Sequence, residues 1–178
     1  MRKVEPMTDI KIQTVTIQEW PQLQAIAKNT FEETFAHQND AQRMQAYLKE
    51  KFSEAQVRQE LANPDSQFYF VRDQDEVVGY LKLNTGKAQT ETQTEPAMEI
   101  ERIYVLSKCQ GKKLGHALLR QALSQAQAQG VAYLWLGVWE KNYRAIAFYE
   151  RHGFERFGEH LFYLGSEAQV DLMLRRYL

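Results

Sequence analysis

The stretch that decides the fold runs from Met98 to Leu119 and reads MEIERIYVLSKCQGKKLGHALL. Residues 99–105 alternate charged with apolar side chains, which predicts a β-strand. Residues 107–115 hold three lysines and two glycines, a composition typical of a turn. From Leu114 onward, apolar residues recur at the spacing of one helical face. A turn that enters a helix presents unpaired N–H groups and the positive end of the helix dipole. The stretch therefore predicts a phosphate site, which the lysines strengthen.

The composition is that of one domain with an ordinary hydrophobic core. The 178 residues are 44% hydrophobic and 25% charged, with a formal net charge of −1. This balance excludes the strongly basic surface of a typical nucleic-acid-binding protein. The one cysteine, Cys109, excludes an intramolecular disulfide and a cysteine-based zinc site, in agreement with an expected cytoplasmic location. No apolar run approaches the ~20 residues that span a membrane. We therefore expect neither nucleic acid nor a membrane as a partner.

The chain before this stretch predicts a strand, three helices and a β-hairpin. We expect residues 1–9 to be a disordered lead and residues 10–178 to form a single domain. The predicted elements are, in order, a strand over 11–17, helices over 18–36, after Asn39-Asp40 and from Ser53-Glu54, and hairpin strands over 67–72 and 76–83. Gly79 inside the second hairpin strand is expected to mark a bulge. The polar residues 84–96 are expected to form a mobile loop between strands.

The chain after this stretch predicts a second strand of the same sheet. Gly130 ends the helix in the usual C-terminal position. Residues 131–139 read VAYLWLGVW, an apolar run typical of a strand buried on both faces. Because strand–helix–strand units cross over in a right-handed sense, we expect the two strands that flank the helix to be parallel. A helix after Asn142 and two strands over 154–163 and 169–176 complete the chain.

This order of elements, together with two sequence motifs, resembles the GCN5-related N-acetyltransferase (GNAT) superfamily. The hexapeptide QGKKLG from Gln110 to Gly115 matches the family's Gln/Arg-x-x-Gly-x-Gly/Ala turn, except that Lys113 stands where the first motif glycine is usual. Residues 142–154, NYRAIAFYERHGF, match the pattern Asn-x-x-Ala-x-x-Phe-Tyr-x-x-x-Gly-Phe. The resemblance implies an α/β (α+β) fold. Its central sheet is mixed and mostly antiparallel, two parallel strands splay apart, and helices flank both faces.

Further segments resemble the PaiA-type spermidine/spermine N-acetyltransferases. They are residues 30–35, 66–70, 99–105, 134–142 and 162–165. This branch implies transfer of an acetyl group from acetyl-CoA to a primary amine of a small polyamine, directly, within a ternary complex. Acetyl-CoA is then a co-substrate, a small-molecule amine is the partner, and the protein is a monomer or homodimer.

The resemblance also implies roles for individual residues. Glu101 is the candidate general base, acting through a water, and Tyr149 is the candidate acid that protonates the leaving thiolate. The backbone of Ile103, Tyr104 and Val105 is implied to pair with the pantetheine arm. The implied pyrophosphate cradle comprises Gln110, Gly111, Lys112, Lys113, Leu114, Gly115 and His116. Asn142 is implied to bond the cofactor.

Structural readings of the same residues remain open. Glu101 fits an exposed strand glutamate or an ion-pair partner equally well, and Asn142 equally fits a helix N-cap. The structural reading of Tyr149 is a core aromatic, but its motif context favours the functional one. Strict alternation places Glu99 and Glu101 on one face of the strand, and Ile100 and Arg102 on the other. Glu99 is expected to contact substrate charge or to lie in solvent.

An acceptor channel for a cationic polyamine is expected to be acidic and partly aromatic. The first helical region offers such side chains: Glu32, Glu33 and Asp40, with Phe31, Phe35 and Tyr47. A solvated helix face over a row of core residues fits them equally well.

Other chemistries are less favoured by the sequence. Cys109 lies in the implied pyrophosphate turn, away from the thioester, so we do not expect an acetyl-cysteine intermediate. The four histidines show no metal-ligand spacing, so we expect no metal. The alternatives are acetylation of another amine, such as a protein N-terminus or an aminoglycoside, and a non-catalytic acyl-CoA-binding regulator. A nucleotide-binding P-loop is weaker, because the Ser/Thr that holds magnesium is missing.

Overall fold

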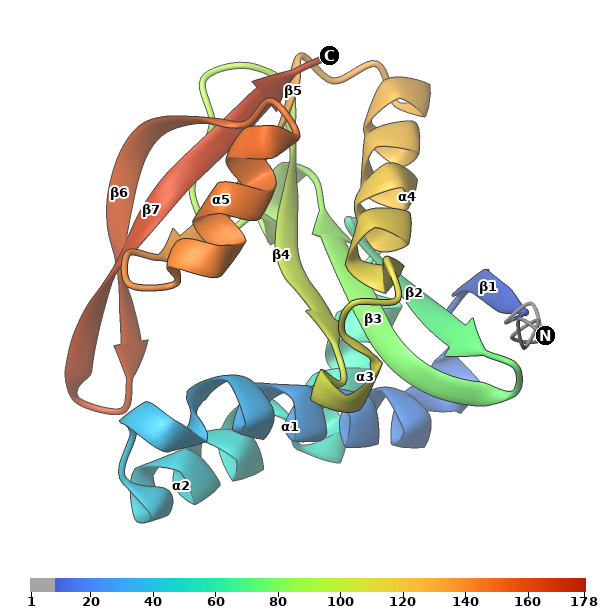
Figure 1. The fold of residues 1–178 in the computed structure, drawn as a ribbon, viewed down its shortest axis with the longest axis vertical. Coiled ribbons are helices and arrows are strands. Elements are labelled where there is room, and N and C mark those ends of the chain that lie inside the picture. Colours follow the sequence, from blue (N-terminus) through green and yellow to red (C-terminus); the bar gives the residue numbers. More distant parts are fainter. Residues whose placement is uncertain (1–8) are drawn as a thin grey trace, which may run out of the picture.

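The computed structural model describes residues 9–178 of the chain (Figure 1). The predicted disordered lead, apart from Asp9, lies outside these residues. Within them, none of the helices combines the length and the apolar composition needed to cross a membrane.

The described residues form one seven-stranded mixed sheet, in the order β1-β2-β3-β4-β5-β7-β6. The strands are β1 (Ile10–Thr14), β2 (Ser66–Asp73), β3 (Glu76–Asn84), β4 (Ala97–Val105), β5 (Tyr133–Trp139), β6 (Glu155–Leu164) and β7 (Glu167–Tyr177). Strands β4 and β5 pair in parallel, and the other neighbours pair antiparallel. The fold predicted from the sequence is confirmed, including the parallel pair.

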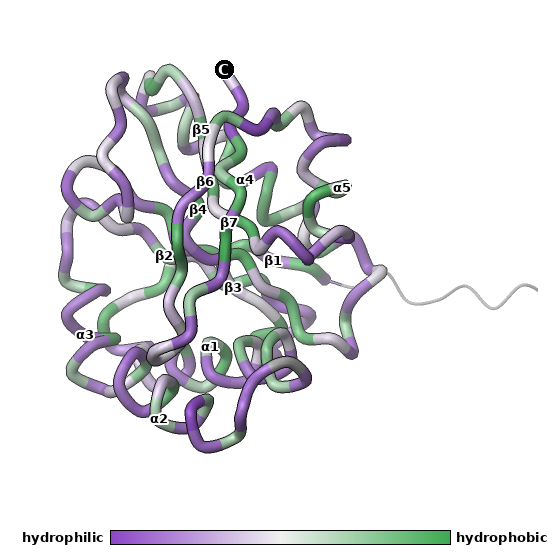
Figure 2. The backbone as a smooth tube through the Cα atoms, turned by 90° about the vertical axis from the view of Figure 1, so that its left-hand side faces the viewer, coloured by the Kyte–Doolittle hydropathy of each residue, from purple (hydrophilic) through white to green (hydrophobic). Residues whose placement is uncertain are grey.

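Helices cover both faces of the sheet (Figure 1). On one face lie α1 (Trp20–Phe35), α2 (Ala41–Lys51) and α3 (Glu54–Ala62), which pack on Phe68, Phe70 and Tyr80. On the other face lie α4 (Leu114–Ala128) and α5 (Tyr143–Arg151), which pack on Leu81, Leu134 and Leu136. Figure 2 shows the hydrophobic residues gathered along the central strands and the hydrophilic ones in the outer loops.

The helix boundaries follow the capping residues read from the sequence. The side chain of Asp40 accepts hydrogen bonds from two backbone N–H groups at the start of α2, and Ser53 accepts one at the start of α3. Gly130, just after α4, has a φ of +66°, the left-handed conformation that favours glycine at a helix end.

Two bulges shape the central strands. The β2–β3 register shifts next to Gly79, as predicted. A Cβ atom at Gly79 would lie 2.5 Å from the carbonyl oxygen of Tyr104, so only glycine fits there. A second shift between β3 and β4 pairs Lys82 with Arg102 and Leu83 with Ile100, which leaves Glu101 as the extra residue. The expectation that Arg102 shares a face with Ile100 is therefore wrong: Arg102 lies beside Glu101, on the side of α1–α3.

The segment between β3 and β4 is bound to the sheet, in contrast to the mobile loop expected from its polar composition. The Trp135 indole donates to the Gln89 side chain at 2.7 Å, and the Tyr133 hydroxyl donates to Gln93 at 2.8 Å. The backbone N–H of Thr90 donates to Glu99 at 2.8 Å. The polar side chains of this segment thus bond to buried groups on β4 and β5.

Candidate active site

The strands β4 and β5 separate at the middle of the sheet. Their parallel pairing ends at Ile100 and Leu136, although β4 continues to Val105 and β5 to Trp139. On its other edge β4 still pairs with β3 as far as Val105. The backbone of Ile103, Tyr104 and Val105 therefore has one bonded edge and one edge without a strand partner. An open edge of this kind can pair with an extended ligand.

The turn before α4 brings backbone N–H groups to the same region. Gly111 and Lys113 have φ angles of +88° and +61°, and α4 begins at Leu114. A Cβ atom placed on Gly111 or Gly115 would meet nothing within 4 Å. The first turn of α4 is thus approachable by a ligand along its backbone, and the predicted strand–turn–helix is confirmed. Its binding of pyrophosphate remains a prediction.

The lysines of this turn are mostly neutralised by neighbouring carboxylates, which corrects the expectation that all three strengthen an anion site. Lys112 pairs with Asp73 at 2.9 Å and Lys108 with Glu76 at 2.6 Å, both at the ends of the β2–β3 turn. Among the described residues, Lys113 makes no ion pair.

Arg144 is a further cation at the turn, and it went unassigned in the sequence analysis. It lies at the start of α5 and donates to the Gln110 side chain at 2.9 Å. Its place in the second motif was visible in the sequence, but its contact with the first motif was not.

Two histidines join α4 to the end of α5. His116 Nδ1 and His152 Nε2 are 2.9 Å apart, and His152 Nδ1 lies 2.7 Å from the carbonyl oxygen of Phe148. Because a carbonyl only accepts, His152 Nδ1 is the donor there. In the neutral pair, His116 Nδ1 then donates to His152 Nε2. His116, a predicted cradle residue, is oriented by this contact.

Tyr149 lies on the face of the sheet that carries α4 and α5. It is 7% exposed and packs edge-on against Phe148 and Phe154. Burial raises the pKa of Tyr149, so its hydroxyl keeps its proton at neutral pH. No described residue hydrogen-bonds this hydroxyl. Asn142 accepts from the N–H of Ala145 at 3.2 Å and thus caps α5; its contact with a cofactor stays a prediction.

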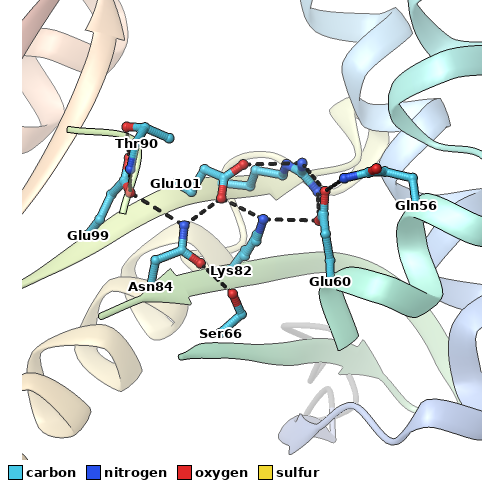
Figure 3. Close-up of polar contacts among 9 residues, drawn as sticks. Gln56, Glu60, Ser66, Lys82, Asn84, Thr90, Glu99 and Glu101 are labelled. Atoms are coloured by element: carbon cyan, nitrogen blue, oxygen red, sulfur yellow. Dashed lines mark hydrogen bonds and ion pairs between the residues drawn. The ribbon is translucent and has the colours of Figure 1, made fainter. Parts of the chain in front are cut away.

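Glu101 is held in a buried ionic network that joins β3, β4 and α3 (Figure 3). Its carboxylate contacts Lys82 Nζ at 2.6 Å and Arg102 Nη2 at 3.2 Å, and it accepts from the Asn84 side chain. Lys82 and Arg102 also bind Glu60, with Arg102 in a bidentate pair at 2.8 and 3.1 Å. Two cations thus balance two carboxylates.

This network determines the protonation state of both glutamates. Burial favours the neutral acid, but Arg102 and Lys82 outweigh it and lower the pKa of Glu101 below its ordinary value. The same cations lower the pKa of Glu60 to about 2. Glu101 is therefore a carboxylate with weakened proton affinity, and its role as a general base stays a prediction.

Glu99 is buried rather than solvated, which corrects one of the expectations for it. It is 2% exposed and accepts from the backbone N–H and the hydroxyl of Thr90 and from Asn84 (Figure 3). Burial raises the pKa of Glu99.

The acidic side chains proposed for an acceptor channel have local structural roles. Asp40 caps α2, Glu33 accepts from the backbone N–H of Ser107 at 2.8 Å, and Glu32 accepts from Gln45 at 2.9 Å. The aromatic candidates do meet: Phe31 stacks on Tyr47 with ring centroids 4.8 Å apart, and Phe35 lies 6.5 Å from Phe162 of β6.

Other carboxylates lie beside the opening between β4 and β5, and sequence reasoning missed them. Asp171 of β7 and Glu91 of the β3–β4 segment both approach His160 of β6. No sequence motif connects these residues, because three separate segments supply them. Across residues 9–178, histidine, cysteine, aspartate and glutamate form no group of three or more that suits a metal ion. Cys109 is buried in the core.

Comparison with known proteins places this geometry in a family. Residues 20–154 match the model of the Acetyltransferase (GNAT) family. The chain is 39% identical over 172 residues to an uncharacterized N-acetyltransferase in the pepI 3' region of Lactobacillus delbrueckii subsp. lactis, covering 97% of this chain and 99% of the relative. It is 27% identical over 157 residues to an uncharacterized N-acetyltransferase of Mycobacterium tuberculosis, covering 88% and 96%.

Solved structures share the fold. The crystal structure of PaiA N-acetyltransferase from Thermoplasma acidophilum in complex with coenzyme A aligns with a TM-score of 0.78 and 21% identity. The alignment covers 96% of this chain and 99% of that chain. Identity at this level supports the fold alone.

Proposed function

Since this chain belongs to the acetyltransferase (GNAT) family and is an N-acetyltransferase, we propose an acceptor for it. The proposed acceptor is a primary amine of a small polyamine. The observation that carries the proposal is the end of the β4–β5 ladder at Ile100 and Leu136, with carboxylates on one side of the opening and the turn before α4 on the other.

The side of α4 suits coenzyme A. The open edge of β4 offers backbone groups for the pantetheine arm, and the turn before α4 offers N–H groups for the pyrophosphate. The proposed binding residues are those of the sequence prediction: Ile103 to Val105, Gln110 to His116, Asn142 and Tyr149. Arg144 joins them through its bond to Gln110. When bound, acetyl-CoA supplies the acetyl group as a thioester.

The opposite side suits a cationic acceptor. Glu91, Glu99 and Asp171 lie near His160 on this side. Carboxylates attract an ammonium group, and the aromatic side chains of Tyr47 and Phe162 offer apolar surface to the carbon chain of a polyamine. The resemblance to the PaiA branch supports the same acceptor.

The chemistry requires a proton to leave the amine and a proton to reach the sulfur. A primary ammonium resembles that of lysine, with a pKa near ~10.4, and is not a nucleophile. Tyr149 is the proposed acid, because its hydroxyl stays protonated and lacks a partner among the described residues. Glu101 is the base predicted from the sequence, and its ion pairs weaken it in that role.

An amine panel tests the proposal. The purified protein is incubated with acetyl-CoA and each amine, and release of free thiol is followed. Reactions without amine and reactions without protein are the controls. We expect turnover with spermidine and spermine. Turnover only with a peptide N-terminus or an aminoglycoside would reject the polyamine and leave the family assignment intact.

A further inference from the structure

His160 lies where the two parallel strands separate. Its side chain is 17% exposed, and it stands opposite Asp171 in the β6–β7 ladder. A Cβ atom on Gly137 would come within 3.1 Å of His160 Nε2 and 3.2 Å of Cε1. Gly137 is the first residue of β5 beyond the last pair with β4. The absence of a side chain at Gly137 thus lets the imidazole lie directly over the start of the opening.

The imidazole approaches this opening from the face opposite Tyr149. Leu136 and Val138 point into the core under α4 and α5, so Gly137 between them faces the other way. Glu99 pairs directly with Trp135 and shares that other face. Tyr149 belongs to the core under α4 and α5. An amine and a thioester that meet in the opening would therefore have Tyr149 on one side and His160 on the other.

The surroundings of His160 suit a group that takes up a proton. Nε2 lies 3.6 Å from Asp171 and Nδ1 lies 3.2 Å from Glu91, and the charge of Glu99 also favours a protonated ring. Nδ1 is buried, and neither Glu91 nor any other described residue meets it in hydrogen-bond geometry. Interaction with Asp171 outweighs burial and raises the pKa of His160 above its ordinary value of 6.5. A general base works best when its pKa lies near the working pH.

Glu101 differs from His160 both in its hydrogen-bond partners and in the direction of its pKa shift. Its carboxylate is occupied by Lys82, Arg102 and Asn84, and these cations lower its pKa. A proton placed on Glu101 would weaken two ion pairs, whereas a proton placed on His160 would strengthen its pairing with Asp171 and Glu91.

We infer that His160 is the catalytic base that accepts a proton from the acceptor ammonium, and that Asp171 positions its ring. This inference rests on the proposed transfer to an amine, whichever amine is accepted. The nitrogen lone pair freed by this step forms a C–N bond to the acetyl carbon, and the C–S bond breaks with its electron pair on sulfur. Of the two protons that leave nitrogen, one goes to His160 and then to solvent. Tyr149 donates its proton to sulfur, and the second proton from nitrogen restores the Tyr149 hydroxyl.

The pH dependence of kcat/KM separates His160 from Glu101. With His160 as base, the wild-type rate should rise with pH through the His160 pKa, since only the neutral imidazole takes a proton. His160→Gln should lose ~10²-fold at neutral pH and recover at high pH, where the amine deprotonates by itself. Glu101→Gln should keep the rising limb. His37→Gln, at an exposed position, is the matched control.

A second measurement does not depend on turnover. The imidazole of His160 is titrated by NMR in the free protein, where Asp171→Asn should lower the midpoint. Unfolding by denaturant shows whether each variant is folded. A wild-type pH profile in His160→Gln, or loss of the rising limb in Glu101→Gln alone, would overturn the inference. If the protein accepts no polyamine, the pH profile of kcat/KM is measured with whichever amine it does accept. Failure of the polyamine proposal therefore leaves this test intact.

Discussion

The two sides of the β4–β5 opening are constructed differently. On the side of α4, the groups facing the opening are backbone groups: the unpaired edge of β4 and the N–H groups of the turn. The lysines there pair at the surface, as Lys112 does with Asp73. On the opposite side the groups are buried charged side chains, such as Lys82 and Glu101, that come from distant segments. A backbone site depends little on side-chain identity, whereas a side-chain site changes with each substitution. If the α4 side binds coenzyme A and the opposite side binds the amine, as proposed, this difference lets one fold keep its cofactor while the acceptor changes.

If the acceptor side depends on balanced buried charge, Lys82→Met should have the largest effect. Lys82 is 5% exposed and contacts both Glu60 and Glu101. Its loss leaves two buried carboxylates with one shared cation, and we expect the free energy of unfolding to fall by ~3–5 kcal/mol. Denaturant unfolding measures this. Lys108→Met removes an exposed ion pair on the side of α4 and should cause no measurable change in the free energy of unfolding. If both variants lost the same free energy of unfolding, the contrast between buried and surface ion pairs would be wrong.

The same network predicts acid sensitivity. The ordinary pKa of Glu60 is 4.5, and in the folded protein it is about 2, because Arg102 and Lys82 outweigh burial. Since the folded pKa is the lower one, the stabilisation is complete above pH ~4.5 and is lost as the pH falls through about 2. The shift corresponds to ~3 kcal/mol at most.

The matched measurement compares the wild type with Glu60→Gln over this pH range. Their difference in unfolding free energy should shrink as the pH falls. A difference that does not vary with pH would show that the charge of Glu60 is not what stabilises the network.

On the side of α4, we expect the Tyr149 side chain to contribute to the rate of acetyl transfer rather than to the binding of acetyl-CoA. Tyr149→Phe should lower kcat by ~10²-fold, as expected for loss of a general acid, with little change in the KM for acetyl-CoA. Thiol release under steady-state conditions measures both. Tyr143→Phe is the control, because Tyr143 lies on the same helix and is 75% exposed. If the KM rises while kcat holds, Tyr149 is a binding residue instead.

The smallest expected effect concerns backbone conformation in the turn. Lys113 has a φ of +61°, where a residue with a side chain is strained and glycine is not. Lys113→Gly should therefore raise the free energy of unfolding by ~0.5–1 kcal/mol. Lys112→Gly, at a position without positive φ, should lower it instead. A loss of stability in Lys113→Gly would mean that the lysine side chain contributes more than its backbone strain costs.

The sequence by itself determined the order of the elements and the residues of the half of the site for which we propose cofactor binding. Periodicity, Ser53, Asp40 and Gly130 located the helices, because capping and amphipathicity act within a few residues. The strand–turn–helix from Met98 to Leu119 followed for the same reason.

Only the tertiary structure decided the half of the site for which we propose acceptor binding. The bulge at Glu101 depends on the register of β3, so alternation along β4 alone misplaced Arg102. Likewise the polar segment before β4 looked mobile until its partners Tyr133 and Trp135 were known. His160, Asp171 and Glu91 meet because strand pairing joins segments far apart in the chain, and the energy of a buried charge depends on such neighbours.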